Sequence, residues 1–198
     1  MVFNVKINLN DLRTKVDWQT IINVGNSLSM FNDRQSLMKK AEIIERTIDC
    51  NNSIGIKYVA EIGHDFICES WNNAKIELKS QFSSALSIYT KEDRMRLTYG
   101  AILKHGRGKI AHIQTEESTP EILILLRRDG ALVVTKDIIL KRSYVSINDI
   151  HISVPWSEVV QITGNMTPTE DYTAYFTRLK EEEMHGYMNI PKREIVQL

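Results

Sequence analysis

The stretch AKIELKSQF, residues 74–82, places an acid and a base two positions apart inside an apolar run. On a β-strand, side chains two positions apart lie on the same face, so Glu77 and Lys79 share one face while Ile76 and Leu78 share the other. Such a pair can be the ordinary solvent-facing side of a half-buried strand. It can also be half of a hydrolytic site, in which the carboxylate holds a divalent cation and the lysine orients or deprotonates an attacking water.

The segment before this strand supplies more acids. IKYVAEIGHDFICES, residues 56–70, is rich in residues that favour strands, and we predict that it pairs with the following strand across the turn WNNA. Its acids share parity and would gather on one face: Glu61, Asp65 and Glu69. Clustered carboxylates repel one another unless a cation lies between them, and hard oxygen ligands suit Mg²⁺. The backbone carbonyl of Leu78 could be a further ligand.

Asp65, followed after eleven residues by Glu77-Leu78-Lys79, resembles the motif of the PD-(D/E)xK nuclease superfamily. This superfamily includes most type II restriction endonucleases, archaeal junction resolvases and several repair nucleases. The resemblance implies that Asp65 and Glu77 hold Mg²⁺ and that Lys79 assists the water. His64 stands where the motif has proline, which leaves Glu61 and Glu69 as alternatives for the first acid.

The resemblance covers roughly residues 33–82, because the family usually places a helix before the hairpin. That helix sometimes contributes another acid, and Glu45 or Glu42 could take the role here; a charged, solvated helix face is the alternative for both.

By this resemblance, we expect a Mg²⁺-dependent type II restriction endonuclease that hydrolyses phosphodiester bonds in double-stranded DNA. We expect it to act as a homodimer, because two copies around a twofold axis cut both strands of a palindromic site. A Holliday-junction resolvase or DNA-repair nuclease of the same fold is one alternative. Another alternative is a non-catalytic DNA-binding or assembly module, in which these acids are ordinary surface residues.

A nuclease must also hold DNA, and lysine and arginine supply most of the affinity for phosphates. We predict that the charged segment 91–109 is helical with a basic end, and that Gly106 and Gly108 let its backbone approach DNA. Lys141 and Arg142 could be a second phosphate contact or simply a charged turn. The candidate DNA-binding residues are Arg94, Arg96, Lys104, His105, Arg107, Lys109 and Gln114. Cations at a helix end are the alternative explanation.

Helices are predicted on both sides of the strand-rich middle of the chain. The first runs from about Asp11 to Val24, capped by Asn10 and ended by Gly25. The second follows Asn32 and Gln35, with Leu37, Ala41, Ile44 and Ile48 at helical spacing. A last helix, about 168–185, opens at the capping box Thr167-Pro168-Thr169-Glu170.

Further strands are predicted in PEILILL and GALVVT around the turn RRDG, and in SYVSINDIHISV. The pattern favours a mixed α/β (α+β) fold with a central mixed sheet flanked by helices, as in restriction endonucleases. We expect one nuclease domain over residues 1–198, with a catalytic core at about 33–140.

The 198 residues include 25 basic and 25 acidic side chains, so the formal net charge is zero. A nucleic-acid partner must therefore be met by a local patch. We expect no secretory signal, the sequence contains no apolar run of membrane-spanning length, and its two cysteines suit a reducing compartment. We expect a cytoplasmic, prokaryotic protein with no membrane partner.

Overall fold

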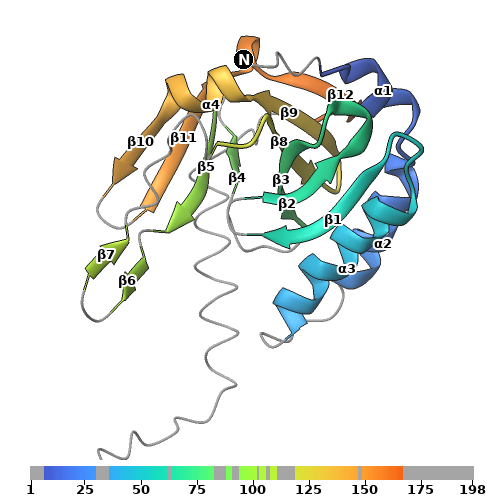
Figure 1. Cartoon of the computed structure of the whole chain (residues 1–198), viewed down its shortest axis with the longest axis horizontal. Coiled ribbons are helices and arrows are strands. Elements are labelled where there is room, and N and C mark those ends of the chain that lie inside the picture. The colour runs from blue at the N-terminus through green and yellow to red at the C-terminus, as the bar shows by residue number, and fades with distance from the viewer. Residues whose placement is uncertain are drawn as a thin grey trace, which may run out of the picture.

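A computed structural model places most of the chain (Figure 1). It describes residues 7–29, 36–61, 64–82, 88–90, 94–101, 103–105, 108–110, 119–146 and 149–166. The predicted last helix lies outside these residues, as do Asn32 and Gln35 and the candidate DNA contacts Arg107 and Gln114.

The fold is mixed α+β, as predicted, and its centre is a six-stranded sheet in the order β1-β2-β3-β8-β9-β12. Strands β3 and β8 are parallel, and the other neighbouring strands are antiparallel. The bounds are β1 Ile56–Glu61, β2 His64–Cys68, β3 Ala74–Gln81, β8 Ile122–Arg127, β9 Gly130–Thr135 and β12 Val160–Gly164. The predicted strands around RRDG are therefore confirmed as the hairpin β8–β9, whereas β12 was not predicted.

Helices α1 (Leu9–Thr14), α2 (Trp18–Ser29) and α3 (Ser36–Cys50) flank this sheet. Figure 1 shows α2 and α3 side by side next to β1. Their apolar residues share one core with the helix-facing side of β2 and β3, and this core includes Leu12, Ile21, Ile44, Ile48, Phe66 and Ile76. Each of these side chains is buried. The predicted helical spacing of Ile44 and Ile48 is thus confirmed, and both face the core.

The first helix was predicted as one element over 11–24, and this is wrong. Residue Val16 leaves the helical path and forms an isolated antiparallel bridge with Asn52. The Asp17 carboxylate then accepts hydrogen bonds from the backbone N–H and the hydroxyl of Thr20, which starts a new helix. Gly25 lies within α2 rather than ending it. A Cβ at this position would lie 2.4 Å from the Phe82 ring, so only glycine leaves room for that ring.

A second, four-stranded sheet has the order β10-β11-β5-β4, and a separate two-stranded sheet joins β6 and β7. The bounds are β4 Ile88–Thr90, β5 Arg94–Ala101, β6 Leu103–His105, β7 Gly108–Ile110, β10 Ser143–Ser146 and β11 Asp149–Pro155. The strands predicted in SYVSINDIHISV are confirmed. The helix predicted over 91–109 is wrong, because RMRLTY alternates polar and apolar residues with the period of a strand, and Met95 is buried while Arg94 is exposed.

A second core fills the space between the two larger sheets. Leu123, Leu125, Leu132 and Val134 come from β8 and β9, and they pack with Met95, Ile152 and Val154 of the four-stranded sheet. Helix α4 (Lys136–Arg142) adds Ile139 to this core. Strands β8 and β9 are therefore covered on both faces, which explains their continuous apolar sequence.

Candidate functional site

The acids of residues 56–70 are distributed differently from the prediction. The segment is a hairpin of β1 and β2 rather than one strand, and Glu61 lies in register with His64. Glu61 has a side chain that is 67% exposed. Glu69 is exposed too and opens the short 3₁₀ helix Glu69–Trp71. The predicted one-sided acidic face is therefore wrong, and Asp65 is the acid that stays beside β3.

Asp65 and Glu77 share the face of β2 and β3 that looks away from the helices. Phe66 pairs with Ile76, both are fully buried, and the next residues outward on the two strands are Asp65 and Glu77. Alternation along both strands makes these carboxylates half-buried. His64, at the position of the motif's proline, is buried and lies 3.5 Å from the Glu61 carboxylate.

The Asp65 carboxylate completes the backbone hydrogen bonding of β3. Its Oδ2 accepts a hydrogen bond of 2.8 Å from the Leu78 N–H, beyond the last paired residues of β2 and β3. Burial raises the pKa of Asp65, while the Leu78 amide and the Lys79 ammonium group oppose this rise. The hydrogen bond fixes one carboxylate oxygen and so orients the group.

Glu77 and Lys79 form an ion pair, with 2.6 Å between Lys79 Nζ and Glu77 Oε1. The Glu77 side chain is 12% exposed and that of Lys79 is 27% exposed. Burial raises the pKa of Glu77, the Lys79 ammonium group lowers it, and the Asp65 carboxylate raises it again. Lys79 therefore pairs with the half-buried carboxylate of Glu77 and acts by charge on that of Asp65.

A further acid, Glu45, stands on helix α3 and interacts with these two carboxylates through charge. Burial, followed by the charge of Asp65, raises the pKa of Glu45 to about 7, and the charge of Glu77 adds to the rise. The other predicted option, Glu42, is 47% exposed and pairs with Arg46 at 2.9 Å. We call Glu45, Asp65 and Glu77 the acid cluster. Helical periodicity explains the placement of Glu45, since it follows the buried Ile44 on the edge of the apolar face.

The chemistry of the acid cluster fits a divalent cation. Each of its three carboxylates has a raised pKa, so each is held where its own negative charge is unfavourable. A cation between them would remove this penalty. In the described part of the chain, no three acidic, histidine or cysteine side chains already stand together as a metal-binding group. Asp65 and Glu77 instead use oxygens to bind the Leu78 amide and Lys79.

The predicted DNA-binding residues that the structure describes lie on strands. Arg94 is exposed at the start of β5, and Arg96 follows on the same strand. Lys104 and His105 belong to β6 and Lys109 to β7, where Lys104 and Lys109 are in register. These residues therefore belong to the four-stranded sheet and the small hairpin, whereas Glu77 and Lys79 belong to the six-stranded sheet.

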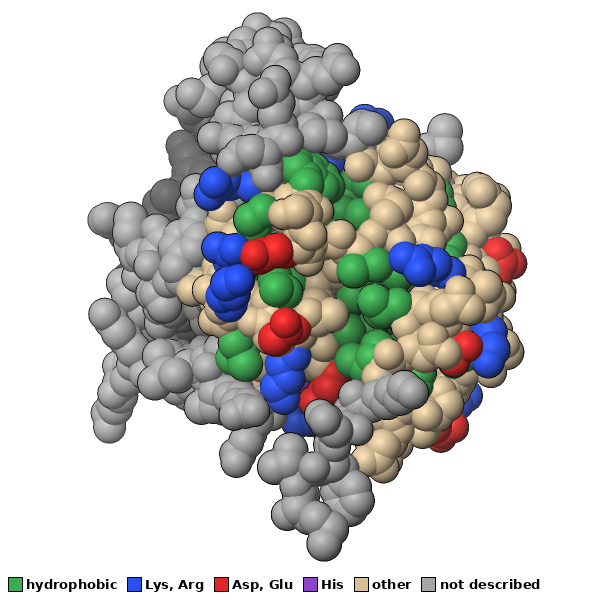
Figure 2. Space-filling view, turned by 90° about the horizontal axis from the view of Figure 1, so that it is seen from above, with side chains coloured by type: hydrophobic (Ala, Val, Ile, Leu, Met, Phe, Trp, Pro, Cys, Tyr) green, Lys and Arg blue, Asp and Glu red, His purple; other side chains and the backbone are tan. Residues whose placement is uncertain are grey.

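Lys141 and Arg142 end helix α4 and are compensated by an acid. Lys141 Nζ lies 3.3 Å from Glu158 Oε1, and Arg142 Nε donates to Glu158 Oε2 at 2.8 Å. Figure 2 likewise shows Lys and Arg side chains next to acidic ones on one part of the surface, rather than a continuous basic patch. A second phosphate contact at these two residues would have to displace Glu158. We call Lys141, Arg142 and Glu158 the ion-pair cluster.

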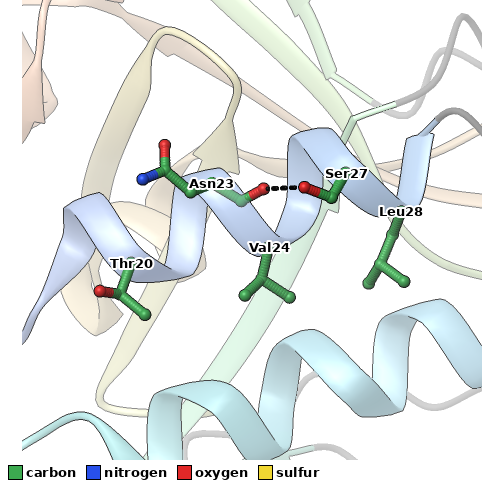
Figure 3. Close-up of a pocket in the computed structure, with 5 residues that line it drawn as sticks. All are labelled: Thr20, Asn23, Val24, Ser27 and Leu28. Atoms are coloured by element: carbon green, nitrogen blue, oxygen red, sulfur yellow. Dashed lines mark hydrogen bonds between the residues drawn. The ribbon is translucent and has the colours of Figure 1, made fainter.

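A shallow cavity of about 290 Å³ lies elsewhere, along helix α2. Figure 3 shows Thr20, Val24 and Leu28 on the side of α2 that faces α3. Asn23 and Ser27 complete its lining, and the Ser27 hydroxyl donates to the Asn23 carbonyl at 2.9 Å. None of these side chains is ionisable, so this cavity offers no acid–base chemistry.

No family model, curated protein or solved structure matches this chain. Among the described helices, none is long and apolar enough to cross a membrane. The fold is mixed α+β, and the feature that stands out in it is a set of half-buried carboxylates beside one lysine. Its function has to be inferred from the chemistry of that set.

Proposed function

We propose that this protein is a Mg²⁺-dependent endonuclease that hydrolyses phosphodiester bonds in double-stranded DNA, of the type II restriction kind. The observation that supports the proposal is the acid cluster, in which Asp65 and Glu77 lie on adjacent strands and Glu45 acts on both by charge. Lys79 lies 2.6 Å from Glu77 in the same place. The resemblance to PD-(D/E)xK nucleases also requires two acids and a lysine on paired strands.

Asp65 and Glu77 would hold Mg²⁺ with the carbonyl of Leu78, and Glu45 would be the additional acid. When bound there, the cation would polarise the phosphate and lower the pKa of a bound water. The hydrogen bond from the Leu78 N–H leaves the second oxygen of Asp65 for this role and keeps the carboxylate oriented.

Lys79 would assist the attacking water. Its ammonium group, 27% exposed, can donate hydrogen bonds to a water and to the phosphate oxygens while Glu77 fixes its position. Its charge offsets the negative charge that develops on phosphorus oxygens in the transition state. In-line attack of the water would break the bond to the 3′ oxygen and leave a 5′-phosphate and a 3′-hydroxyl, as in the resembling family.

DNA would be held by cations outside the acid cluster. Arg94, Arg96, Lys104, His105 and Lys109 lie on strands of the four-stranded sheet and the small hairpin. A two-stranded ribbon is narrow enough for the major groove, and lysines neutralise phosphates without reading sequence. Two copies of the chain would be needed to cut both strands of a palindromic site.

The test is cleavage of plasmid DNA with Mg²⁺, compared with the same reaction in EDTA. We expect cleavage by the parent and by Glu42→Gln, a matched control on the same helix whose acid is exposed and paired with Arg46. We expect none from Glu77→Ala or Lys79→Ala. Equal cleavage by the parent and these two variants would show that the proposed site is wrong.

The products separate the related activities. Discrete plasmid fragments favour a restriction enzyme, whereas selective cutting of four-way junctions or damaged duplexes favours a resolvase or a repair nuclease. A DNA-binding module without catalysis would retard DNA on a gel, leave it intact, and bind no Mg²⁺.

A further inference from the structure

Arg127, predicted only as part of the turn RRDG, ends the strand that lies beside β3. The two strands are parallel, and Arg127 is in register with Gln81, two residues after Lys79. Residues in register on adjacent strands share a face of the sheet, as do residues two positions apart on one strand. The side chain of Arg127 therefore leaves the sheet on the same face as Lys79 and Glu77.

The two hydrophobic cores support this assignment of faces. Leu78 and its partner in register, Ile124, both belong to the core under the helices. Leu125, in register with Lys79, belongs instead to the core between the two larger sheets. Lys79 and Arg127 lie on the side of this second core, yet their side chains are 27% and 16% exposed. The second core therefore ends at these two cations.

Lys79 and Arg127 are close enough to act on one anion. Adjacent strands lie about 4.8 Å apart and two residues advance about 6.7 Å along a strand, which puts the two Cα atoms about 8 Å apart. Each residue has a long side chain that can reach a phosphate placed between them. Asp65 belongs to β2, on the other side of β3, so the acids and Arg127 flank Lys79 from opposite directions.

Asp129 holds Arg127 across the turn. The Nη2 of Arg127 donates to Asp129 Oδ2 at 3.0 Å. A guanidinium has five N–H donors in one rigid plane and keeps its charge, so an arginine that pairs with one carboxylate can donate to a phosphate as well. A cation that is already oriented stabilises charge on a phosphate oxygen without reorganisation during the reaction.

We propose that Arg127 is a catalytic residue that donates to a non-bridging oxygen of the scissile phosphate and stabilises the negative charge developing there. The inference rests on the proposed function, since it adds Arg127 to the phosphodiester site of Lys79 and the acid cluster. Arg127 transfers no proton, because its guanidinium stays protonated throughout. It also does not bind the Mg²⁺ ion, which belongs to the carboxylates.

The test is single-turnover cleavage of plasmid DNA with Mg²⁺ at saturating protein. Arg127→Gln is expected to lower the cleavage rate constant about a hundredfold, the usual effect of removing one donor to a developing charge. Calorimetry without DNA should show unchanged Mg²⁺ binding by this variant. Arg128→Gln is the matched control, because Arg128 has the same charge and is exposed in the same turn. It is expected to cut at the parental rate.

A purely structural role for Arg127 predicts another pattern. Arg127→Gln removes the partner of Asp129, whose other oxygen, Oδ1, is buried and accepts no hydrogen bond within the described residues. If this loss alone slowed cleavage, the double variant Arg127→Gln/Asp129→Asn would recover the parental rate, whereas we expect it to stay slow. Thermal unfolding serves as the folding control for all variants.

The outcomes separate this inference from the proposed function. Recovery of the rate in the double variant, or a parental rate in Arg127→Gln, overturns the role of Arg127. Either result leaves the proposed function intact as long as the parent cuts and Lys79→Ala does not. If the folded parent does not cut DNA with Mg²⁺, the proposed function fails and this inference fails with it.

Discussion

The acid cluster and the ion-pair cluster each contain a glutamate, and the two glutamates, Glu45 and Glu158, have pKa values shifted in opposite directions. Glu158 has two cations within hydrogen-bond reach, and the hydrogen bond from Arg142 leads the causes that lower its pKa to about 2. Glu45 is half-buried near two other carboxylates, and its pKa is raised to about 7. The charges of the ion-pair cluster are compensated by one another, whereas the three acids of the acid cluster keep raised pKa values even with Lys79 beside Glu77. Uncompensated half-buried charge is what distinguishes a candidate site from an ordinary surface pair.

The largest expected effect is on the rate of DNA cleavage, which substitutions at the two sites should change differently. Lys79→Ala is expected to lower the rate of Mg²⁺-dependent cleavage at least about a hundredfold, because it removes the group that assists the water. Glu158→Gln is expected to leave that rate unchanged, since Glu158 pairs with Lys141 and Arg142 rather than with Glu77 or Lys79. Initial rates of plasmid nicking measure both. A similar loss in the two variants would contradict the distinction.

Asp65 combines a structural and a proposed chemical task, and two substitutions separate them. Asp65→Asn keeps an oxygen that can accept from the Leu78 N–H but removes the charge, so we expect near-parental stability and no Mg²⁺ binding. Asp65→Ala also leaves the Leu78 amide without its partner, which costs about 1–3 kcal/mol. Urea unfolding and calorimetry provide the two measurements. Normal Mg²⁺ binding by Asp65→Asn would show that the carboxylate acts only as a structural acceptor.

The acid cluster and the ion-pair cluster should also respond oppositely to pH. Glu45 has a pKa above its usual value, so the folded state binds more protons than the unfolded state, and stability falls as pH rises from about 4.5 to about 7. Asp65 and Glu77 act in the same direction. Glu158, with its lowered pKa, contributes stability above pH 4.5 that is lost as pH falls toward 2.

Glu45→Gln is therefore expected to stabilise the metal-free protein at pH 8 by about 1–2 kcal/mol and to have little effect at pH 4.5. Urea unfolding at the two pH values measures this difference. If the substitution destabilises the protein equally at both, Glu45 does not carry unfavourable charge.

The smallest effects are expected at Lys141 and Arg142. Replacing both by Gln should lower stability slightly and leave the salt dependence of DNA binding unchanged, because Glu158 already compensates them. Replacing Lys104 and Lys109 by Gln should reduce that salt dependence. Fluorescence anisotropy with a labelled duplex at several salt concentrations measures both. A reduced slope in the first double variant would make these cations DNA contacts.

The sequence predicts strand β3 and its two faces well, because alternation of Ile76 and Leu78 with charged residues is a local property. Glu45 was also a reasonable candidate, since helical periodicity around Ile44 and Ile48 is local too. The prediction for Glu61 and Glu69 was wrong because residues 56–70 do not form a single strand. Glu61 lies at the end of β1, Asp65 lies in β2, and Glu69 opens a 3₁₀ helix.

Longer-range packing was harder to predict. Residues 91–109 have many charges and were expected to be helical. Instead, β5 forms by antiparallel pairing with the distant strand β11, from Arg94 opposite Pro155 to Ala101 opposite Asp149. Tertiary contacts of this kind have no signature in a single sequence.

The most direct test of the central claim is calorimetric titration of Mg²⁺ at pH 6.5 in two buffers that differ in ionisation enthalpy. If the acid cluster binds a cation, the parent should bind Mg²⁺ and release protons, because the cation lowers the raised pKa of Glu45. Glu77→Gln should abolish the binding, and Glu158→Gln should not change it. Absence of binding in the folded parent, or equal binding by Glu77→Gln, would contradict the account.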